Sequence, residues 1–172
     1  MPRVHTVKKA RKDYPNYGIK KGETYYHWSF NYGPTVKSKI YPKQSQLTQS
    51  DFLQQVYALQ ERLEEISTDS SNLENARCER DDIVSELRSL AEECEERRDN
   101  MPESLQDAPS GQTLESRVDS CNEMADELES IDLDIELEES DDEEEQESNQ
   151  EDFDNNATSA LEELTGISYN GE

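Results

Sequence analysis

The spacing of apolar residues between positions 48 and 131 is the feature that most limits what this chain can fold into. Apolar side chains recur there every three or four positions, with charged residues between them. A repeat of that period places the apolar side chains on one face of an α-helix. Each stripe takes only about two positions in seven, which is typical of helices that pair through a narrow seam. The middle of the chain is therefore predicted to be helical and coiled-coil-like.

Three helices are predicted, near 49–67, 72–99 and 112–131, separated by the serine-rich segment 67–72 and the proline-containing loop 100–111. The predicted seam residues are Phe52, Val56, Leu59, Leu63, Ile66, Ile83, Leu87, Leu90, Leu114, Val118 and Leu128. The second and third helices should form an antiparallel hairpin, because a short loop joins them. The first helix either packs as a third member or runs on into the second. Exposed seams would leave room for a homodimer through the helices.

The charge of the chain changes sign along its length. Residues 1–47 hold ten Lys or Arg and two acidic residues, residues 48–125 hold seven Arg and twenty acidic residues, and residues 126–172 hold twenty acidic residues and no Lys or Arg. Apolar residues make up only 31% of the 172 residues, so a single large core is excluded. This asymmetry predicts three parts: a basic module over 1–47, a helical region over 48–131 and an acidic tail over 132–172.

The basic module contains a run of alternating aromatic residues. The alternation over 24–32 has a period of two, which predicts a strand, and 35–41 is predicted as a second strand after a Gly-Pro pair. The two form a β-hairpin. Because an isolated hairpin is only marginally stable in water, it needs a partner. That partner is expected to be the first helix or the segment around Val4, Val7 and Ile19.

Two hypotheses compete for these aromatic residues. They are the only core that the module has, or some of them lie on a lysine-rich surface and stack on bases while the lysines contact phosphates. The hypothesis of single-stranded nucleic acid binding names Lys8, Lys9, Arg11, Lys12, Lys20, Lys21, Tyr25, Trp28, Lys37, Lys39 and Tyr41 as the interface. Both hypotheses hold if one face of the hairpin packs in the core and the other binds nucleic acid.

The tail from Asp132 onward is predicted to be disordered, because a dense run of like charges repels itself. Two more specific interpretations remain open. The tail could shield the protein's own basic module from nucleic acid, or its carboxylates could imitate phosphates and occupy the DNA site of a host protein. Near its end, Leu161, Leu164 and Ile167 form a short amphipathic stretch that could make a terminal helix.

Several classes of function are not indicated by the sequence. The three cysteines are at least sixteen residues apart, and the only two histidines lie 22 apart, so no metal site, metal or other cofactor is predicted. Nucleotide-binding loops and hydrolase motifs are missing, so we expect no enzyme. No apolar run is long enough to span a membrane, and the first residues do not form a secretory signal. A cytoplasmic protein without a membrane partner is expected.

Three segments carry a resemblance: VKKARKD at 7–13, IKKGETYYHWSF at 19–30 and QLTQSDF at 46–52. They resemble a small group of uncharacterised phage and prophage proteins of no known function. The resemblance implies a zinc-ribbon-like module with a CxxC pair before the KKG turn, where this chain has Tyr14 and Tyr17 instead. It therefore implies a module that has lost its metal, and a phage origin with action in the host cytoplasm or in the virion.

Two classes of function follow from these features. The first is a non-enzymatic accessory protein that binds nucleic acid weakly through its basic module and is regulated by its acidic tail. The second is a factor directed at a host or phage protein, either an inhibitor that imitates DNA or a scaffold-like assembly protein.

Overall fold

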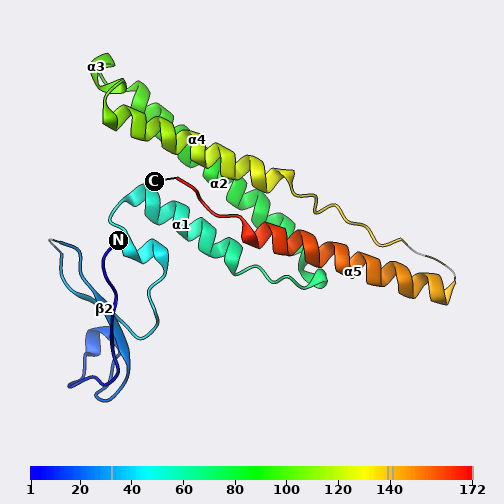
Figure 1. Cartoon of the computed structure of the whole chain (residues 1–172), viewed down its shortest axis with the longest axis horizontal. Helices are drawn as coiled ribbons and strands as arrows, with labels where there is room; N and C mark the ends of the chain where they lie inside the picture. The colour runs from blue at the N-terminus through cyan, green and yellow to red at the C-terminus, as the bar shows by residue number, and fades with distance from the viewer. Residues whose placement is uncertain (32, 139, 141, 172) are drawn as a thin grey trace. The chain divides into compact units, whose positions relative to one another are not determined.

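The chain is mainly α-helical with a small antiparallel sheet near its N-terminus, which confirms the predicted fold class (Figure 1). A computed structural model describes residues 1–31, 33–138, 140 and 142–171. Contacts within the chain divide it into two compact units, residues 1–58 and residues 59–172. The boundary lies inside helix α1 (Asp51–Glu64), later than the predicted boundary at residue 47.

The first unit is built on a sheet of three strands, β1 (His5–Val7), β2 (Tyr25–Trp28) and β3 (Val36–Ser38), with β2 in the centre. Both pairings are antiparallel. The β2–β3 pair is the predicted hairpin, although its strands are shorter than the predicted ones. Strand β1 supplies the partner that a two-stranded hairpin needs.

Alternation along β2 divides its side chains between the two faces of the sheet, as predicted. On one face Tyr25 packs with Ala10 and Ile19 in a small buried cluster, and Val7 and Tyr14 pack against it. Trp28, which points to the other face, is also buried. Each face of β2 therefore carries a buried aromatic ring. Tyr32 lies outside the described residues.

Two 3₁₀ turns and the start of α1 complete the first unit. The turns are η1 (Pro15–Tyr17) and η2 (Gln44–Leu47). Helix α1 begins after Ser50, whose hydroxyl accepts a hydrogen bond from the Leu53 amide at 3.4 Å. Capping of this kind satisfies an amide that the helix itself leaves unpaired.

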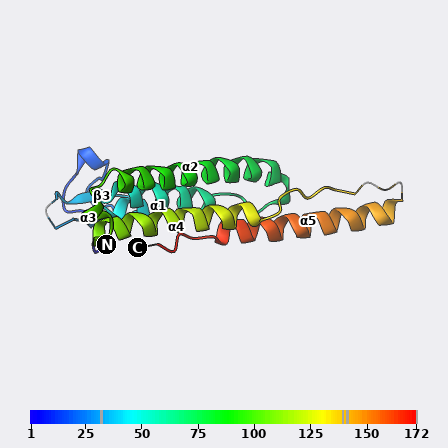
Figure 2. The same ribbon diagram turned by 90° about the horizontal axis from the view of Figure 1, so that it is seen from above.

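The second unit contains the remaining helices. They are η3 (Ser70–Asn72), α2 (Leu73–Asp99), α3 (Glu103–Gln106), α4 (Pro109–Ser130) and α5 (Glu143–Gly166). Helices α2 and α4 lie side by side in both views (Figures 1 and 2). They are antiparallel, since Arg88 pairs with Asp126 at 2.5 Å while Arg98 pairs with Glu115 at 3.4 Å. The predicted hairpin is thus present, and η3 separates α1 from α2 as the three-helix interpretation requires.

The predicted seam residues form most of the helical core. Nine of them are buried: Phe52, Val56, Leu59, Leu63, Ile83, Leu87, Leu90, Leu114 and Leu128. Ile66 and Val118 are half-buried, and Ile66 lies beyond the end of α1. Within the described residues the strongly exposed large apolar side chains are Met1, Tyr17, Ile40, Tyr41 and Leu105. None of these belongs to the seam, so the exposed stripe that would have favoured a homodimer is not observed there.

The acidic tail differs from its prediction. The structure has a 24-residue helix, α5, where we expected disorder with a short terminal helix. Ala157, Leu161 and Leu164 follow a spacing of four and three residues and are fully buried, so α5 has an apolar stripe. The carboxylate of Asp142 accepts hydrogen bonds from two amides at the start of the helix. The predicted tail residues Glu139, Asp141 and Glu172 lie outside the described residues.

Helix α5 is joined to the rest of the second unit by polar contacts. The Ser70 hydroxyl donates a hydrogen bond to Asp154 at 2.6 Å, and the Tyr169 amide donates one to the side chain of Gln60 at 3.4 Å. Among the described residues, no helix has both the length and the apolar character required to cross a membrane.

Candidate nucleic-acid interface

A tight turn before the KKG segment positions two tyrosines. Tyr14 and Ile19 exchange backbone hydrogen bonds of 2.8 and 3.2 Å, and η1 lies between them. Gly18 closes the turn with a φ of 65°, a left-handed conformation that favours glycine. The turn, which lies where the resemblance predicts a CxxC pair, is closed by backbone hydrogen bonds. No cluster of three or more potential metal-binding side chains occurs in the part of the chain that the structure describes.

Two lysines lie over these tyrosine rings. The ammonium of Lys37 on β3 is 4.9 Å from the centre of the Tyr14 ring and 5.3 Å from that of Tyr17, and the ammonium of Lys12 is 5.6 Å from the Tyr14 ring. Each such cation–π contact contributes about 0.5–1 kcal/mol at an exposed site. We refer to Lys12, Tyr14, Tyr17 and Lys37 as the tyrosine–lysine cluster. The cluster connects the turn with β3 at the edge of the sheet, since Lys37 lies about twenty residues after the two tyrosines in the sequence.

A pair of histidines lies on the same face of the sheet. His5 on β1 is the register partner of His27 on β2, and their rings stack with centroids 5.2 Å apart and planes 18° apart. His27 is in turn the partner of Lys37, so the three side chains form a row across the strands. Burial lowers the pKa of His27, and the positive charges of His5 and Lys37 lower it further.

Most of the positive charge around this face has no acidic partner. The first unit carries ten Lys or Arg and three acidic residues, a net charge of +7. Glu23 pairs with Lys39 at 3.0 Å and accepts the Lys20 amide, both of which lower the pKa of Glu23, and Asp13 accepts the Lys21 amide. Among the described residues of the first unit, the basic side chains that form no ion pair are those of Arg3, Lys8, Lys9, Arg11, Lys12, Lys20, Lys21 and Lys37.

The predicted interface residues separate into two groups. Seven basic residues are exposed and Lys37 is half-buried: Lys8, Lys9, Arg11, Lys12, Lys20, Lys21, Lys39 and Lys37 make up this group. Tyr25 and Trp28, by contrast, are only 7% and 3% exposed. Their assignment to the interface was wrong, because both rings are buried and cannot stack on a base. Tyr41 is 60% exposed and packs edge-on against Tyr26, with ring centres 5.3 Å apart.

The structure adds residues that sequence analysis did not assign to the interface. Tyr17 is 39% exposed and lies beside Lys37. His27 is the register partner of the same lysine, and His5 is the partner of His27 on the next strand. The alternation over 24–32 placed His27 on a strand, but His5 was not placed on one, because β1 has only three residues. Only the fold shows that positions 5, 17 and 37 lie on one surface.

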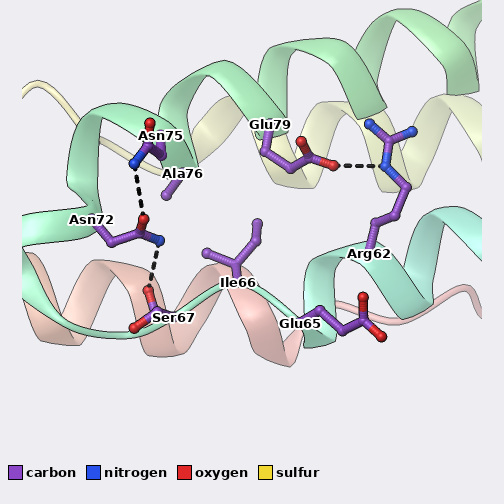
Figure 3. A pocket seen from close by; sticks show the side chains of 8 residues that line it. All are labelled: Arg62, Glu65, Ile66, Ser67, Asn72, Asn75, Ala76 and Glu79. Carbon is purple, nitrogen blue, oxygen red and sulfur yellow. Dashed lines mark hydrogen bonds and ion pairs between the residues drawn. The ribbon is translucent and has the colours of Figure 1, made fainter.

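The second unit contains a hollow of about 360 Å³ between α1, the following loop and α2 (Figure 3). Its polar groups bond to one another: Arg62 with Glu79 at 2.6 Å, and Asn72 with both Asn75 and the Ser67 carbonyl. Figure 3 shows the apolar Ile66 side chain between these two groups. Polar groups that already have partners gain little from a ligand. We therefore assign no site to this hollow.

The remainder of the second unit presents a strongly acidic surface. It carries 39 acidic residues and seven Arg, a net charge of −32. Several of the arginines are already paired, among them Arg62 with Glu79 and Glu86, and Arg77 with Asp134. A polyanion would therefore be repelled by this unit, and a basic partner would be attracted to it.

Comparison of the chain with protein-family models, with curated proteins and with solved structures gives no match. The resemblance to phage and prophage proteins therefore stays a prediction. The function must be argued from the chain's own surfaces.

Proposed function

We propose that the protein is a non-enzymatic accessory protein whose residues 1–58 bind single-stranded nucleic acid weakly, and whose acidic unit limits that binding. The observation that carries this proposal is the excess of unpaired cations in a unit of net charge +7, one of which, Lys37, lies over the exposed ring of Tyr17. Lysines follow a phosphate backbone without regard to sequence, and an exposed aromatic ring supplies stacking of about 1–3 kcal/mol per base.

Stacking on an exposed tyrosine would make this surface prefer a single strand to a duplex. Bases in a duplex present only their edges, whereas those of a single strand present their faces. Tyr17 and Tyr41 are the exposed rings available for this role in the first unit, as far as the structure describes it. In its described residues the first unit consists of three short strands, two 3₁₀ turns and the start of α1, so contacts to phosphate and to base faces are the expected mode.

The acidic unit acts on this binding through charge. Its net charge of −32 opposes the approach of any polyanion, and salt screens that opposition over about 10 Å at 0.1 M. Regulation by the acidic unit is thus expected to weaken binding at low salt, where the lysines would otherwise bind most tightly.

The test is fluorescence anisotropy of a labelled single strand and a labelled duplex with the full chain at low salt. Replacing Lys8, Lys12 and Lys20 by Gln should reduce affinity for both probes and flatten the salt dependence by about 0.7 per lost phosphate contact on the single strand. Tyr17→Leu should reduce single-strand binding alone. Arg97→Gln, an exposed change in the acidic unit, is the control and should not weaken binding. Absence of binding at about 50 mM salt, where phosphate contacts are strong, would refute the proposal.

A second candidate is a factor directed at a basic protein partner, as a DNA mimic or a scaffold-like assembly protein. The excess of carboxylates on the second unit favours it. In that case the chain should displace a labelled oligonucleotide from a basic DNA-binding protein while failing to bind the oligonucleotide itself.

A further inference from the structure

The row His5–His27–Lys37 brings two imidazoles and one ammonium together on one face of the sheet in the first unit. Antiparallel partners share a face of the sheet, so the two imidazoles and the ammonium lie on neighbouring strands in that order. Each step between strands is about 4.8 Å. A lysine ammonium is ordinarily charged at neutral pH, whereas an unperturbed imidazole has a pKa near 6.5.

We propose that His5 and His27, together with Lys37, form a proton-dependent subsite for the phosphate groups of a single nucleic-acid strand. This inference rests on the proposed function and assigns part of that interface. The phosphodiester oxygens only accept hydrogen bonds, and a protonated imidazole offers two N–H donors in addition to its charge. The subsite adjoins the tyrosine–lysine cluster through Lys37, so phosphate contacts and base stacking would share one surface.

The surroundings of the pair explain why protonation and phosphate binding should depend on each other. His27 faces His5 at 5.2 Å, Lys37 across the strands, and the Tyr25 ring at 6.1 Å, and Arg11 and Tyr14 act on that tyrosine. No carboxylate in the described part of the chain contacts either histidine. A second proton on this row is therefore opposed by like charge, which is consistent with the lowered pKa of His27.

An anion placed on the row would remove that opposition. The bound state then takes up protons that the free state does not hold, so affinity must rise as the pH falls through the range where histidine titrates. Each proton taken up increases affinity by up to tenfold per pH unit. If the histidines did not contact the bound nucleic acid, its affinity would show no such increase on acidification.

The experiment measures the affinity of the full chain for a labelled oligothymidylate of about 15 nucleotides, near the upper site size of small single-strand binders. Affinities at about pH 7.5 and about pH 5.5 bracket the titration of histidine. The wild type is compared with the double variant His5→Gln, His27→Gln and with Lys21→Gln. Because the carboxylates of the acidic unit are the same in all three chains, differences between the chains cancel their contribution. Fluorescence of Trp28, the only tryptophan and buried in this unit, verifies folding at both pH values.

The wild type should gain about tenfold in affinity on acidification, and the double variant about twofold or less. At the lower pH, the salt dependence of the wild type should be steeper by up to about 1.4, from about 0.7 for each of two additional phosphates. Lys21→Gln should weaken binding at both pH values and keep the gain.

Two results would overturn the inference. Binding that is equal at both pH values, or a gain that persists in the double variant, would reject the histidine subsite and leave the proposed function intact. Absence of binding at both pH values would reject both. His5→Gln alone, a change at an exposed position of an edge strand, provides the readout if the double variant does not fold.

Discussion

Replacing Leu87 by Ala probes the packing of α2 in the second unit. Leu87 is fully buried on the stripe of α2 that the sequence predicts as a seam. The change removes three carbon atoms, and at about 0.8 kcal/mol for each this amounts to about 2.4 kcal/mol. The cavity left behind adds to this, and Leu-to-Ala changes in cores cost about 2–5 kcal/mol. We expect a loss of about 3 kcal/mol in the free energy of unfolding of this unit.

The buried thiols provide the assay. Cys94 and Cys121 are 1% and 0% exposed, and burial raises the pKa of Cys121 to about 12, so neither reacts with a thiol reagent until the helices open. With the exposed Cys78 replaced by Ser, the rate of modification reports the population of the open state. A loss of about 3 kcal/mol should accelerate the reaction by roughly 100-fold, since 1.4 kcal/mol is a factor of ten.

Leu105→Ala serves as the matched control. Leu105 lies in the same unit and is 47% exposed, so its truncation should change the free energy of unfolding by less than about 0.5 kcal/mol and the rate about twofold. If Leu87→Ala reacts at the rate of the control, Leu87 is not packed and the orientation of α2 is wrong.

Three further predictions concern other parts of the chain. The native protein should show one rapidly reacting thiol, Cys78, in a titration without denaturant, and a second rapid thiol would contradict the packing of α2 on α4. Because the pKa of His27 is lowered in the fold, its contribution to stability is complete above about pH 6.5 and is lost as the pH falls through the folded value. In melts followed by Trp28 fluorescence, the His27→Gln variant should therefore lose less stability on acidification than the wild type. Equal losses in the two proteins would count against this. Gly111→Ala should destabilise the second unit by about 1–3 kcal/mol, because its Cβ would clash with the backbone carbonyl of Gln106 at the end of α3. Gly166→Ala, where the space is open, should be neutral or slightly stabilising, and urea unfolding followed by circular dichroism measures both variants.

The helices could be predicted from the sequence because their information is local. Leu87 and Leu128 belong to stripes of regular spacing, and such spacing identifies a helix and its buried face without knowledge of the partner. Helix α5 was predicted only as a short terminal helix, and its N-terminal part was expected to be disordered. Its buried residues, Ala157, Leu161 and Leu164, follow a dense acidic run, and the charge of that run predicted disorder although the stripe was visible.

The interface could be predicted only in part. The exposed lysines follow from composition, but alternation along β2 gives two faces and does not say which one is covered. In the structure both faces of β2 carry a buried ring, Tyr25 on one face and Trp28 on the other. The contacts of Lys37 with Tyr14 and Tyr17 join positions about twenty residues apart, and no local pattern specifies them.

The separation of residue types between the two units has a consequence for covalent modification. All eight lysines lie at or before position 43, and all three cysteines lie after position 58. Lysine acetylation, which removes one positive charge per event, can therefore alter only the first unit. Seven acetylations would cancel its net charge of +7, whereas oxidants of thiols would act on the helical unit alone. The two units of one chain are thus open to separate chemical control, by acyl transfer at one and by redox chemistry at the other.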